Sequence, residues 1–238
     1  MPHLSGAVVL VTGANGGLGR EFVEQALARG AAKVYATARR PQSWHDSRIV
    51  PLALDVTSPA SIRAAVAQAP DVSLLINNAG ISVESDTLAG LPEEDFRRVM
   101  ETNFFGPVAL TRAFAPVLAA NETSAVLNIH SALSWIALTG AYSASKAALW
   151  SATNSFRLEL APQGTHVTGV HVAFIDTAMA KGVDAPKISP EEVVRKSFDG
   201  LEQAEYEVIV DDTTARVKHG LAGPIMDLYP GLTSTAAV

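Results

Sequence analysis

Short apolar runs alternate along this chain with longer segments in which apolar residues recur at helical spacing. The runs are rich in Val, Ile and Leu and predict strands at residues 7–11, 33–37, 49–54, 72–76, 125–130, 167–172 and 206–210. The periodic segments predict helices from the first glycine-rich turn to about residue 30, and at residues 59–68, 92–120, 142–161 and 190–203. Ser58 is the expected N-cap of the second helix, and Pro107 is expected to bend the third.

Near-continuous apolar strands separated by helices are typical of a parallel sheet that is buried on both faces. The predicted fold class is therefore α/β, a doubly wound parallel sheet with helices on both faces. We expect a single domain over residues 1–238, with a glycine-rich half at 1–120 and a second half at 121–238. Residues 177–189 have little periodicity and are a candidate mobile lid, and no element is readable from residue 220 on.

Composition narrows the possible partners. The 238 residues are 48% hydrophobic and 18% charged, which argues against long disorder. The net charge of −6 comes from acids spread along the chain. No run of basic residues is present to bind a phosphate backbone, so nucleic acid is not an expected partner. There is no cysteine and no His/Asp/Glu cluster at ligand spacing, so no catalytic metal is expected. With no signal-like start and no apolar run of about 18 residues, we expect a cytoplasmic protein without a membrane partner.

The glycine-rich turn at residues 12–19 is the first candidate site. It follows a strand and precedes a helix, and backbone N–H groups at such a helix start bind phosphate. Gly13 is expected to make the tight turn, Gly17 to let a pyrophosphate approach and Gly19 to allow close packing. The alternative is a plain glycine-rich connection, but the position after the first strand favours a dinucleotide site.

The end of the second strand bears on the choice of nicotinamide cofactor. Ala38 stands where an acid would bind the ribose 2′-hydroxyl and repel a 2′-phosphate, and Arg39 and Arg40 follow it. Guanidinium pairs well with phosphate, although two arginines on a loop are also an ordinary solvated surface. We therefore expect the cofactor to be NADP(H).

The reacting groups are expected in the second half of the chain. Tyr142 and Lys146 open the helix at 142–161, and their spacing of four puts them on one face. A tyrosine, with a reference pKa of about 10, acts as an acid/base near neutral pH only when its phenolate is stabilised, as a nearby ammonium would do. Ser131 follows the fifth strand, at the sheet edge where ligands bind, so its hydroxyl is a candidate to hold a substrate oxygen. The plain alternative is a helix-start tyrosine, an exposed lysine and a turn serine.

These features follow one another along nearly the whole chain: the glycine run at 12–19, Asn77-Asn78-Ala79-Gly80, Asn103, Ser131 and the Tyr142/Lys146 pair. In this order they resemble the short-chain dehydrogenase/reductase family, which has a Rossmann-like fold. The resemblance implies a catalytic tetrad of Asn103, Ser131, Tyr142 and Lys146. Tyr142 would protonate the substrate carbonyl, and Ser131 would orient and polarise it. Lys146 would bind the nicotinamide ribose and lower the tyrosine pKa, and Asn103 would hold a water of a proton relay.

The resemblance also implies a cofactor half at residues 1–120 and a catalytic and substrate half at residues 121–238, although Asn103 lies in the first half and some cofactor contacts lie in the second. The positions that would contact the cofactor are Gly13, Asn15, Gly16, Gly17, Leu18, Gly19, Arg39, Asp55, Val56, Asn77, Ala79, Gly80, Tyr142, Lys146, Ile175 and Thr177. Pairing through the helices at 92–120 and 142–161 would give a homodimer or homotetramer. Two departures are present: Val172-Ala173 replaces the usual Pro-Gly, and the loop at 132–141 is shorter than usual.

Apolar residues near the reacting groups suggest the kind of substrate. Leu133, Trp135 and Met179 are candidates to face it, which favours a hydrophobic ketone, diketone or keto ester, although these residues can also be core. His130 and His171 lie in predicted strands nearby and either assist proton transfer or, as we expect, are core histidines.

We therefore predict an NADPH-dependent carbonyl reductase that also runs in reverse as an alcohol dehydrogenase. The alternatives are a catalytically silent NADP-binding sensor or scaffold, and a reductase of sugar or acyl-carrier substrates. All four reacting positions are retained, which favours an enzyme, and the acidic balance gives little support to docking of an acidic carrier.

Overall fold

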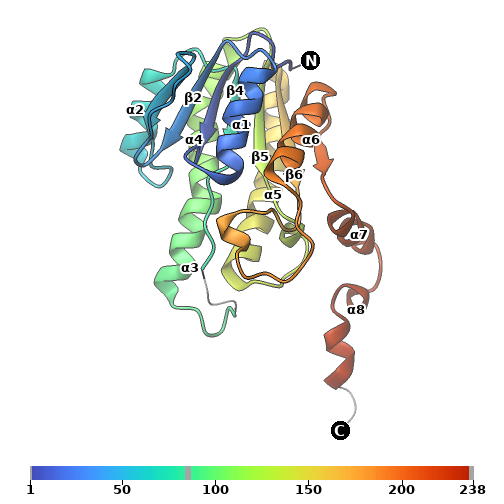
Figure 1. Ribbon diagram of the computed structural model, residues 1–238. Coiled ribbons are helices and arrows are strands. Elements are labelled where there is room, and N and C mark those ends of the chain that lie inside the picture. Colours follow the sequence, from blue (N-terminus) through green and yellow to red (C-terminus); the bar gives the residue numbers. More distant parts are fainter. Residues whose placement is uncertain (1, 84–86, 236–238) are drawn as a thin grey trace.

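Seven parallel strands form one sheet in the order β3-β2-β1-β4-β5-β6-β7 (Figure 1). The computed structural model describes residues 2–83 and 87–235. The predicted doubly wound parallel sheet is confirmed, with every predicted strand present to within two residues at each end. The strands are β1 (Val8–Thr12), β2 (Lys33–Ala38), β3 (Ile49–Ala53), β4 (Leu74–Asn77), β5 (Ser124–Ile129), β6 (Thr165–His171) and β7 (Glu207–Ile209).

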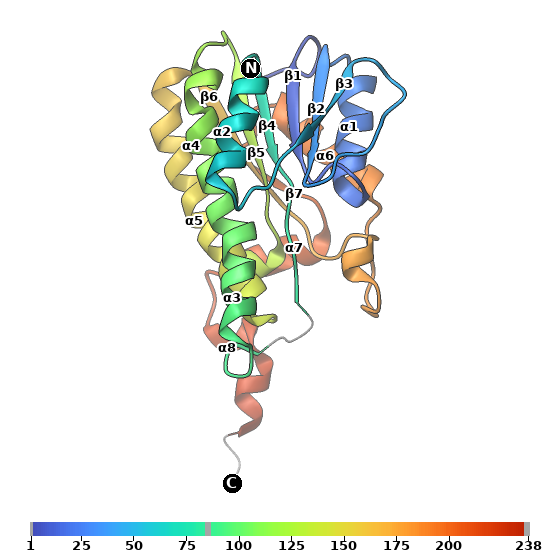
Figure 2. The ribbon, with the colours of Figure 1, turned by 90° about the vertical axis from the view of Figure 1, so that its left-hand side faces the viewer.

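Helices cover both faces of the sheet (Figure 2). One face carries α1 (Gly17–Ala28) and α6 (Pro190–Glu202), and the other carries α2 (Pro59–Gln68), α4 (Gly106–Ala119) and α5 (Gly140–Leu160). Phe22 of α1 meets Phe198 of α6 edge-on, with ring centroids 5.3 Å apart. Such fully buried aromatic pairs contribute about 0.5–1.5 kcal/mol beyond the area they bury. Both faces of the sheet are therefore buried in apolar packing, and only the ends of the strands remain open for a site.

The prediction of one helix over residues 92–120, bent at Pro107, is wrong in one respect. It is divided into α3 (Glu93–Met100), a π-helical turn at Glu101–Phe105 and α4, so the irregularity precedes Pro107. Pro107 has no N–H to donate to the carbonyl four residues earlier, which belongs to Asn103. The N–H of Gly106 instead donates to Glu101, five residues back. The loosened turn carries Asn103, and π-turns of this kind occur frequently at functional sites.

The remaining connections differ in detail from the sequence pattern. Ser58 caps α2 as predicted, its hydroxyl accepting from the N–H of Ser61 at 3.3 Å. The candidate lid is closed at its base by a bridge between Ile175 and Ile188. The pattern predicted no element after the last strand, yet α7 (Asp212–Gly220), α8 (Ile225–Leu228) and a 3-10 turn at Pro230–Thr235 follow; residues 236–238 lie outside the described part. Among the described residues, no helix is long and apolar enough to cross a membrane.

Candidate active site

The carboxyl edge of the sheet gathers most of the predicted site residues. From β1 the chain builds outward to β2 and β3, then returns to place β4 on the other side of β1. Ligands of open α/β sheets bind at the carboxyl ends of the strands where the order reverses in this way. The glycine turn follows β1, the Asn77–Gly80 motif follows β4 and Ser131 follows β5, so residues far apart in sequence meet at this edge.

The glycine turn has the shape of an anion cradle. Gly13 and Gly17 both have positive φ, +68° and +51°, which favours glycine. A Cβ at Gly19 would lie 2.2 Å from the carbonyl oxygen of Gly13, so only glycine lets α1 pack against the turn. The first turn of α1 contains no acidic residue, and no side chain caps it at Gly16. Its free N–H groups are therefore available to a phosphate.

Thr12 and Asn78 hold this edge together, and neither was assigned a role from sequence. The Thr12 hydroxyl accepts from the N–H groups of Asn78 and Ala79, both at 2.9 Å, and the Asn78 amide donates to the Thr12 carbonyl at 2.8 Å. The signal was present in the sequence, since Asn78 lies inside the quoted motif. Asn77, predicted to contact the cofactor, has its side chain buried, and its amide donates to Thr111 and Asn128. A contact between Asn77 and a cofactor would have to come from its backbone.

The two arginines after β2 lie beside the glycine turn. The Asn15 amide donates to the carbonyl of Arg40 at 2.7 Å, which ties the two loops together. Arg39 and Arg40 are exposed, and neither makes an ion pair with any described residue. Hydrogen bonds from Thr57, and then the charge of Arg39, hold the pKa of Asp55 below its usual value. Both guanidinium groups thus remain free to bind an anion.

Tyr142 and Lys146 lie close together at the start of α5. The ammonium of Lys146 is 5.6 Å from the centroid of the Tyr142 ring and donates to the carbonyl of Ile129 at 2.7 Å. Lys146 is only 4% exposed, so the alternative of a surface lysine is wrong. Burial raises the pKa of Tyr142 to about 12, opposite to the lowering by Lys146 that the resemblance implied, and burial lowers the pKa of Lys146 to about 8. A lysine with this pKa exchanges protons readily near neutral pH.

Ser131 faces Tyr142 from the end of β5. Its hydroxyl accepts from the N–H of Leu133 at 3.1 Å, and its nearness to the Tyr142 hydroxyl opposes the rise in the tyrosine pKa. The hydroxyl keeps its own proton and a second lone pair, so it can donate to a neighbouring oxygen while it accepts from Leu133. The 3-10 turn at Ala132–Ser134 closes a capping box with Ser131, which fixes the serine locally.

Asn103 completes the cluster from the π-turn. Its amide donates to the Ser145 hydroxyl at 3.1 Å, and that hydroxyl donates to the carbonyl of Tyr142 at 2.7 Å. A Cβ at Gly80 would lie 3.4 Å from the Asn103 side-chain oxygen and 3.9 Å from the Lys146 nitrogen, so both atoms border the space beside Gly80. The four residues of the expected tetrad are therefore brought into one cluster.

The segment after β6 folds back over the glycine turn. The Thr177 methyl group would be 3.4 Å from a Cβ at Gly17. Ala173 stands where the family usually has the glycine of a Pro-Gly pair. Its N–H donates to the Asp211 carboxylate at 2.8 Å, and its φ is not positive. The alanine is thus accommodated without backbone strain.

The three candidate substrate residues differ in exposure. Met179 is 52% exposed on the lid, and Leu133 is half-buried. The Trp135 ring packs between other groups: its centroid is 4.1 Å from that of His171 and 6.1 Å from that of Trp150. The structure thus gives Trp135 a packing role, and contact with a substrate stays a prediction.

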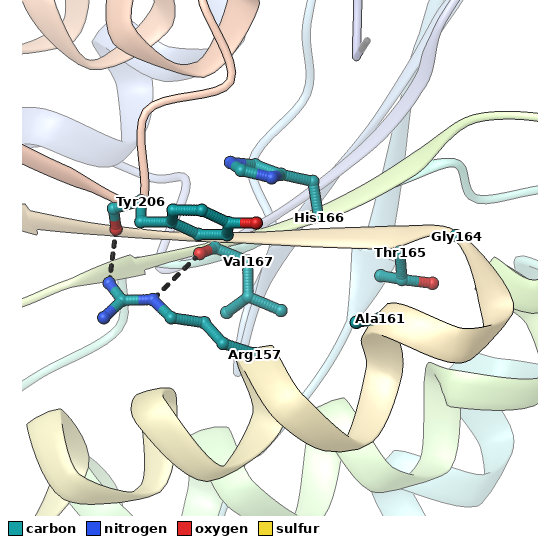
Figure 3. Close-up of a pocket in the computed structure, with 7 residues that line it drawn as sticks. All are labelled: Arg157, Ala161, Gly164, Thr165, His166, Val167 and Tyr206. Atoms are coloured by element: carbon teal, nitrogen blue, oxygen red, sulfur yellow. Dashed lines mark hydrogen bonds between the residues drawn. The ribbon is translucent and has the colours of Figure 1, made fainter.

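A hollow lies at the end of β6 opposite to this cluster, lined by Arg157, Ala161, Gly164, Thr165, His166, Val167 and Tyr206 (Figure 3). The Arg157 guanidinium donates to the carbonyls of Val167 and Tyr206, and to the side chain of Asn154. Its donors are committed to fastening β7 to β6. This hollow therefore belongs to the framework that supports the edge strand.

Comparisons with known proteins agree with this geometry. The profile of the short chain dehydrogenase family matches residues 7–187. A short chain dehydrogenase from Burkholderia cenocepacia, solved in complex with NADP, is 36% identical, covers 97% of this chain and 99% of its own, and superposes with a TM-score of 0.91. A dehydrogenase/reductase SDR family protein 7-like of Drosophila melanogaster is 30% identical over 99% of this chain and 82% of its own length. A 3-oxoacyl-[acyl-carrier-protein] reductase of Vibrio cholerae is 32% identical over 76% of this chain and 79% of its own. The chain therefore belongs to the short-chain dehydrogenase/reductase family of oxidoreductases.

Proposed function

We propose that this oxidoreductase is an NADPH-dependent carbonyl reductase, acting reversibly on a hydrophobic ketone, diketone or keto ester. One observation carries the proposal: the Ser131 hydroxyl and the Tyr142 phenol meet at the carboxyl edge of the sheet, with buried Lys146 beside them. This combination supplies a hydrogen-bond donor and a proton for one carbonyl oxygen.

The residues present fit a bound NADPH. The Gly13–Gly19 cradle, which a side chain at Gly19 would fill, suits the pyrophosphate, and the free Arg39 and Arg40 suit a 2′-phosphate. The lack of an acid at Ala38 removes the group that would repel that phosphate. The related dehydrogenase of Burkholderia cenocepacia was solved with NADP, which supports this choice.

The chain's own groups then have the following roles. When bound, NADPH would supply the hydride for the carbonyl carbon. Ser131 donates a hydrogen bond to the carbonyl oxygen and orients it, and Tyr142 gives that oxygen its proton. The resulting phenolate is stabilised by the Lys146 ammonium and regains a proton through it. Asn103 keeps the backbone of Tyr142 in place through Ser145.

The substrate class rests on the apolar residues near this cluster. Leu133 is half-buried beside Ser131, and Met179 extends from the lid into solvent. The Vibrio cholerae relative is named for reducing a 3-oxoacyl group, which is also a carbonyl flanked by an apolar chain. An acyl-carrier or sugar substrate is a competing outcome of the assay below.

The test is to follow NADPH absorbance with purified enzyme and a panel of aromatic ketones, diketones, keto esters, sugars and acyl thioesters, with NADH in parallel. NADPH consumption with an apolar ketone, reduced by at least about a hundredfold in Tyr142→Phe, would support the proposal. Consumption only with sugars or acyl thioesters would assign one of those substrate classes. NADPH binding without turnover of any substrate would instead support a sensor or scaffold.

We also propose a homodimer or homotetramer built through α3, α4 and α5. Exposed apolar side chains on these helices support it: Phe105, next to α4, is 50% exposed, and Leu158 of α5 is 79% exposed. Analytical ultracentrifugation of the wild type and of Leu158→Glu tests it, and a monomeric wild type would overturn it.

A further inference from the structure

His171 touches the backbone of the expected catalytic serine. It is the last residue of β6, is fully buried, and its Nδ1 lies 3.3 Å from the carbonyl oxygen of Ser131. A carbonyl oxygen can only accept, so Nδ1 carries a proton in this contact. His171 is thus a neutral or charged imidazole with its Nδ1–H aimed at Ser131.

The other hydrogen bonds of Ser131 are local in sequence. Its carbonyl also accepts from the N–H of Ser134 at 3.0 Å, and its N–H donates to the Ser134 hydroxyl at 3.3 Å. Its side chain accepts from Leu133 at 3.1 Å. The turn fixes Ser131 relative to its own loop. The N–H groups of His130 and Ala132 donate to the carbonyls of Val170 and Val172, which ties the backbone on both sides of Ser131 to the neighbouring strand, and His171 adds a side-chain hydrogen bond to Ser131 itself.

The imidazole of His171 is held flat between two other rings. The His130 ring lies 4.7 Å away at an interplanar angle of 22°, and the Trp135 ring lies 4.1 Å away at 11°. A side chain at Gly169 would exclude this arrangement, since its Cβ would be 2.8 Å from the His130 ring. The stack therefore fixes the plane of the His171 ring, and the hydrogen bond to the Ser131 carbonyl selects the orientation in which Nδ1 faces Ser131.

The tautomer of His130 is also determined by its partner. Thr153 donates its hydroxyl proton to the Leu149 carbonyl at 2.8 Å and accepts from Asn128 at 2.9 Å. Its contact with His130 Nε2, at 3.1 Å, therefore takes a proton from His130. The two stacked histidines thus carry their protons on different nitrogens, and each is specified by a separate neighbour.

The far edge of His171 faces one carboxylate. Its Nε2 has no hydrogen-bond partner among the described residues and lies 3.7 Å from Glu207 Oε1. Glu207 is itself fixed by the indole N–H of Trp150 at 3.0 Å and by Lys218. Burial holds the pKa of His171 at about 4, against the opposing influence of Glu207, so the ring is neutral near pH 7. A second proton would go to Nε2, facing Glu207, and the Nδ1–H would remain on Ser131 in either state.

We propose that His171 is a positioning residue of the reductase: its Nδ1–H fixes the Ser131 carbonyl so that the Ser131 hydroxyl points at the substrate oxygen. The inference rests on the proposed function, because it gives His171 a part in the same reaction. It needs no proton transfer to or from His171.

Two substitutions test the role of Nδ1–H. His171→Asn keeps an N–H donor near the position of Nδ1, and His171→Leu removes it. We expect His171→Leu to lower kcat about tenfold, the effect of one lost hydrogen bond, with an unchanged Kd for NADPH, and His171→Asn to stay within about threefold of the wild type. Equal losses in both variants would overturn the proposal.

A double-mutant cycle separates positioning from general support of the fold. If His171 acts through Ser131, His171→Leu has little further effect on kcat in a Ser131→Ala background. The same tenfold loss in both backgrounds would show that His171 supports the fold and does not position the serine.

Nitrogen NMR of histidine-labelled wild-type protein tests the contact without any turnover, and His171→Asn identifies the signal. A proton on Nδ1 and none on Nε2 near pH 7 is the expected result, and a proton on Nε2 alone would overturn the inference in an active enzyme. An inactive wild type that still shows the Nδ1 proton would mean that the proposed function has failed while the contact is real.

Discussion

Asn103 and Ile81 exchange two hydrogen bonds, each 2.9 Å long. The Asn103 side-chain oxygen accepts from the Ile81 N–H, and its amide donates to the Ile81 carbonyl. One side chain thus satisfies both backbone groups of a residue in the loop after β4, while the same amide donates to Ser145. The π-turn is therefore fastened to two parts of the site at once.

Replacing Asn103 by leucine should affect both stability and catalysis. Two backbone groups lose their partners, so the free energy of unfolding should fall by about 2–4 kcal/mol. The link through Ser145 to Tyr142 is lost as well, so kcat should fall at least about tenfold. Urea unfolding and steady-state kinetics measure the two effects.

Asn121→Leu is the matched control for Asn103. Its amide donates to the carbonyls of Val72 and Val117, at 3.1 and 2.9 Å, away from the reacting groups. It should lower stability and leave kcat unchanged. If Asn103→Leu also left kcat unchanged, the link to Tyr142 would have no catalytic importance.

Gly19→Ala should weaken binding of NADPH. The new Cβ would need to lie 2.2 Å from the Gly13 carbonyl, so the turn must move, at a cost of about 1–3 kcal/mol in stability. Because the displaced turn is the proposed site of the pyrophosphate, we expect the Kd for NADPH, measured by fluorescence titration, to rise at least about tenfold.

Gly16→Ala is the companion variant, since a Cβ there meets nothing within 4 Å. It should leave the melting temperature unchanged, and any loss of affinity would report on the pyrophosphate space itself. Equal melting temperatures for Gly19→Ala and the wild type would contradict the close packing seen at Gly19.

Local chemistry explains why much of this site could be predicted. Ser58 precedes Pro59 and a periodic run, so the bounds of α2 follow from capping rules. Tyr142 and Lys146 share a helix face because of their spacing, and Ser131 reaches the sheet edge because it follows a strand. Each of these inferences uses residues close together in the chain.

Contacts between distant segments could not be predicted in this way. His171 meets Ser131 only through the pairing of β5 with β6, which places the end of one strand beside the end of the other. The packing of Trp135 against His171 and Trp150 could not be predicted, because those residues lie on two other elements; its contact with a substrate stays a prediction. The π-turn depends on Pro107, whose effect is one turn earlier than predicted.

Ala38→Asp should reverse the cofactor preference. A carboxylate at the end of β2 would accept from a ribose 2′-hydroxyl and repel a 2′-phosphate, so the NADPH/NADH ratio of kcat/KM should fall by about a hundredfold or more.

Arg39→Ala should raise KM for NADPH about tenfold to a hundredfold and leave KM for NADH unchanged, because one charge-assisted contact is lost. Arg63→Ala, an exposed arginine on α2, is the control and should change neither. Similar losses with both cofactors in Arg39→Ala would mean that Arg39 does not read the 2′-phosphate.

Lys146→Met should stabilise the protein near neutral pH. Burial lowers the pKa of Lys146 from 10.5 to about 8 in the folded protein, so between these values the unfolded chain binds more protons and stability rises with pH. Below about pH 8 the full cost of burying the charge, about 3 kcal/mol, is present, offset by about 1 kcal/mol from the hydrogen bond to Ile129. Removing the charge should therefore raise the free energy of unfolding by about 2 kcal/mol at pH 7.

The pH dependence provides the sharper test of Lys146. The advantage of Lys146→Met over the wild type should shrink between about pH 8 and pH 9.5, as the wild type loses its buried charge. Urea unfolding at several pH values measures this, with the exposed Lys181→Met as control. A constant difference across this range would show that the buried ammonium does not titrate as stated.

Met179→Ala should affect substrate binding and leave stability unchanged, whereas Trp135→Ala should mainly lower stability. Met179 is 52% exposed on the lid and contributes little to the fold, so its loss should change the free energy of unfolding by less than about 0.5 kcal/mol. If it covers an apolar substrate, KM for that substrate should rise about threefold to tenfold. Trp135 fills a space against His171 and Trp150, so its truncation should cost about 3–5 kcal/mol of stability. Met226→Ala, on α8, is the control for surface methionines and should change neither quantity. A higher KM with full stability in Trp135→Ala would instead show that Trp135 contacts the substrate and contributes little to packing.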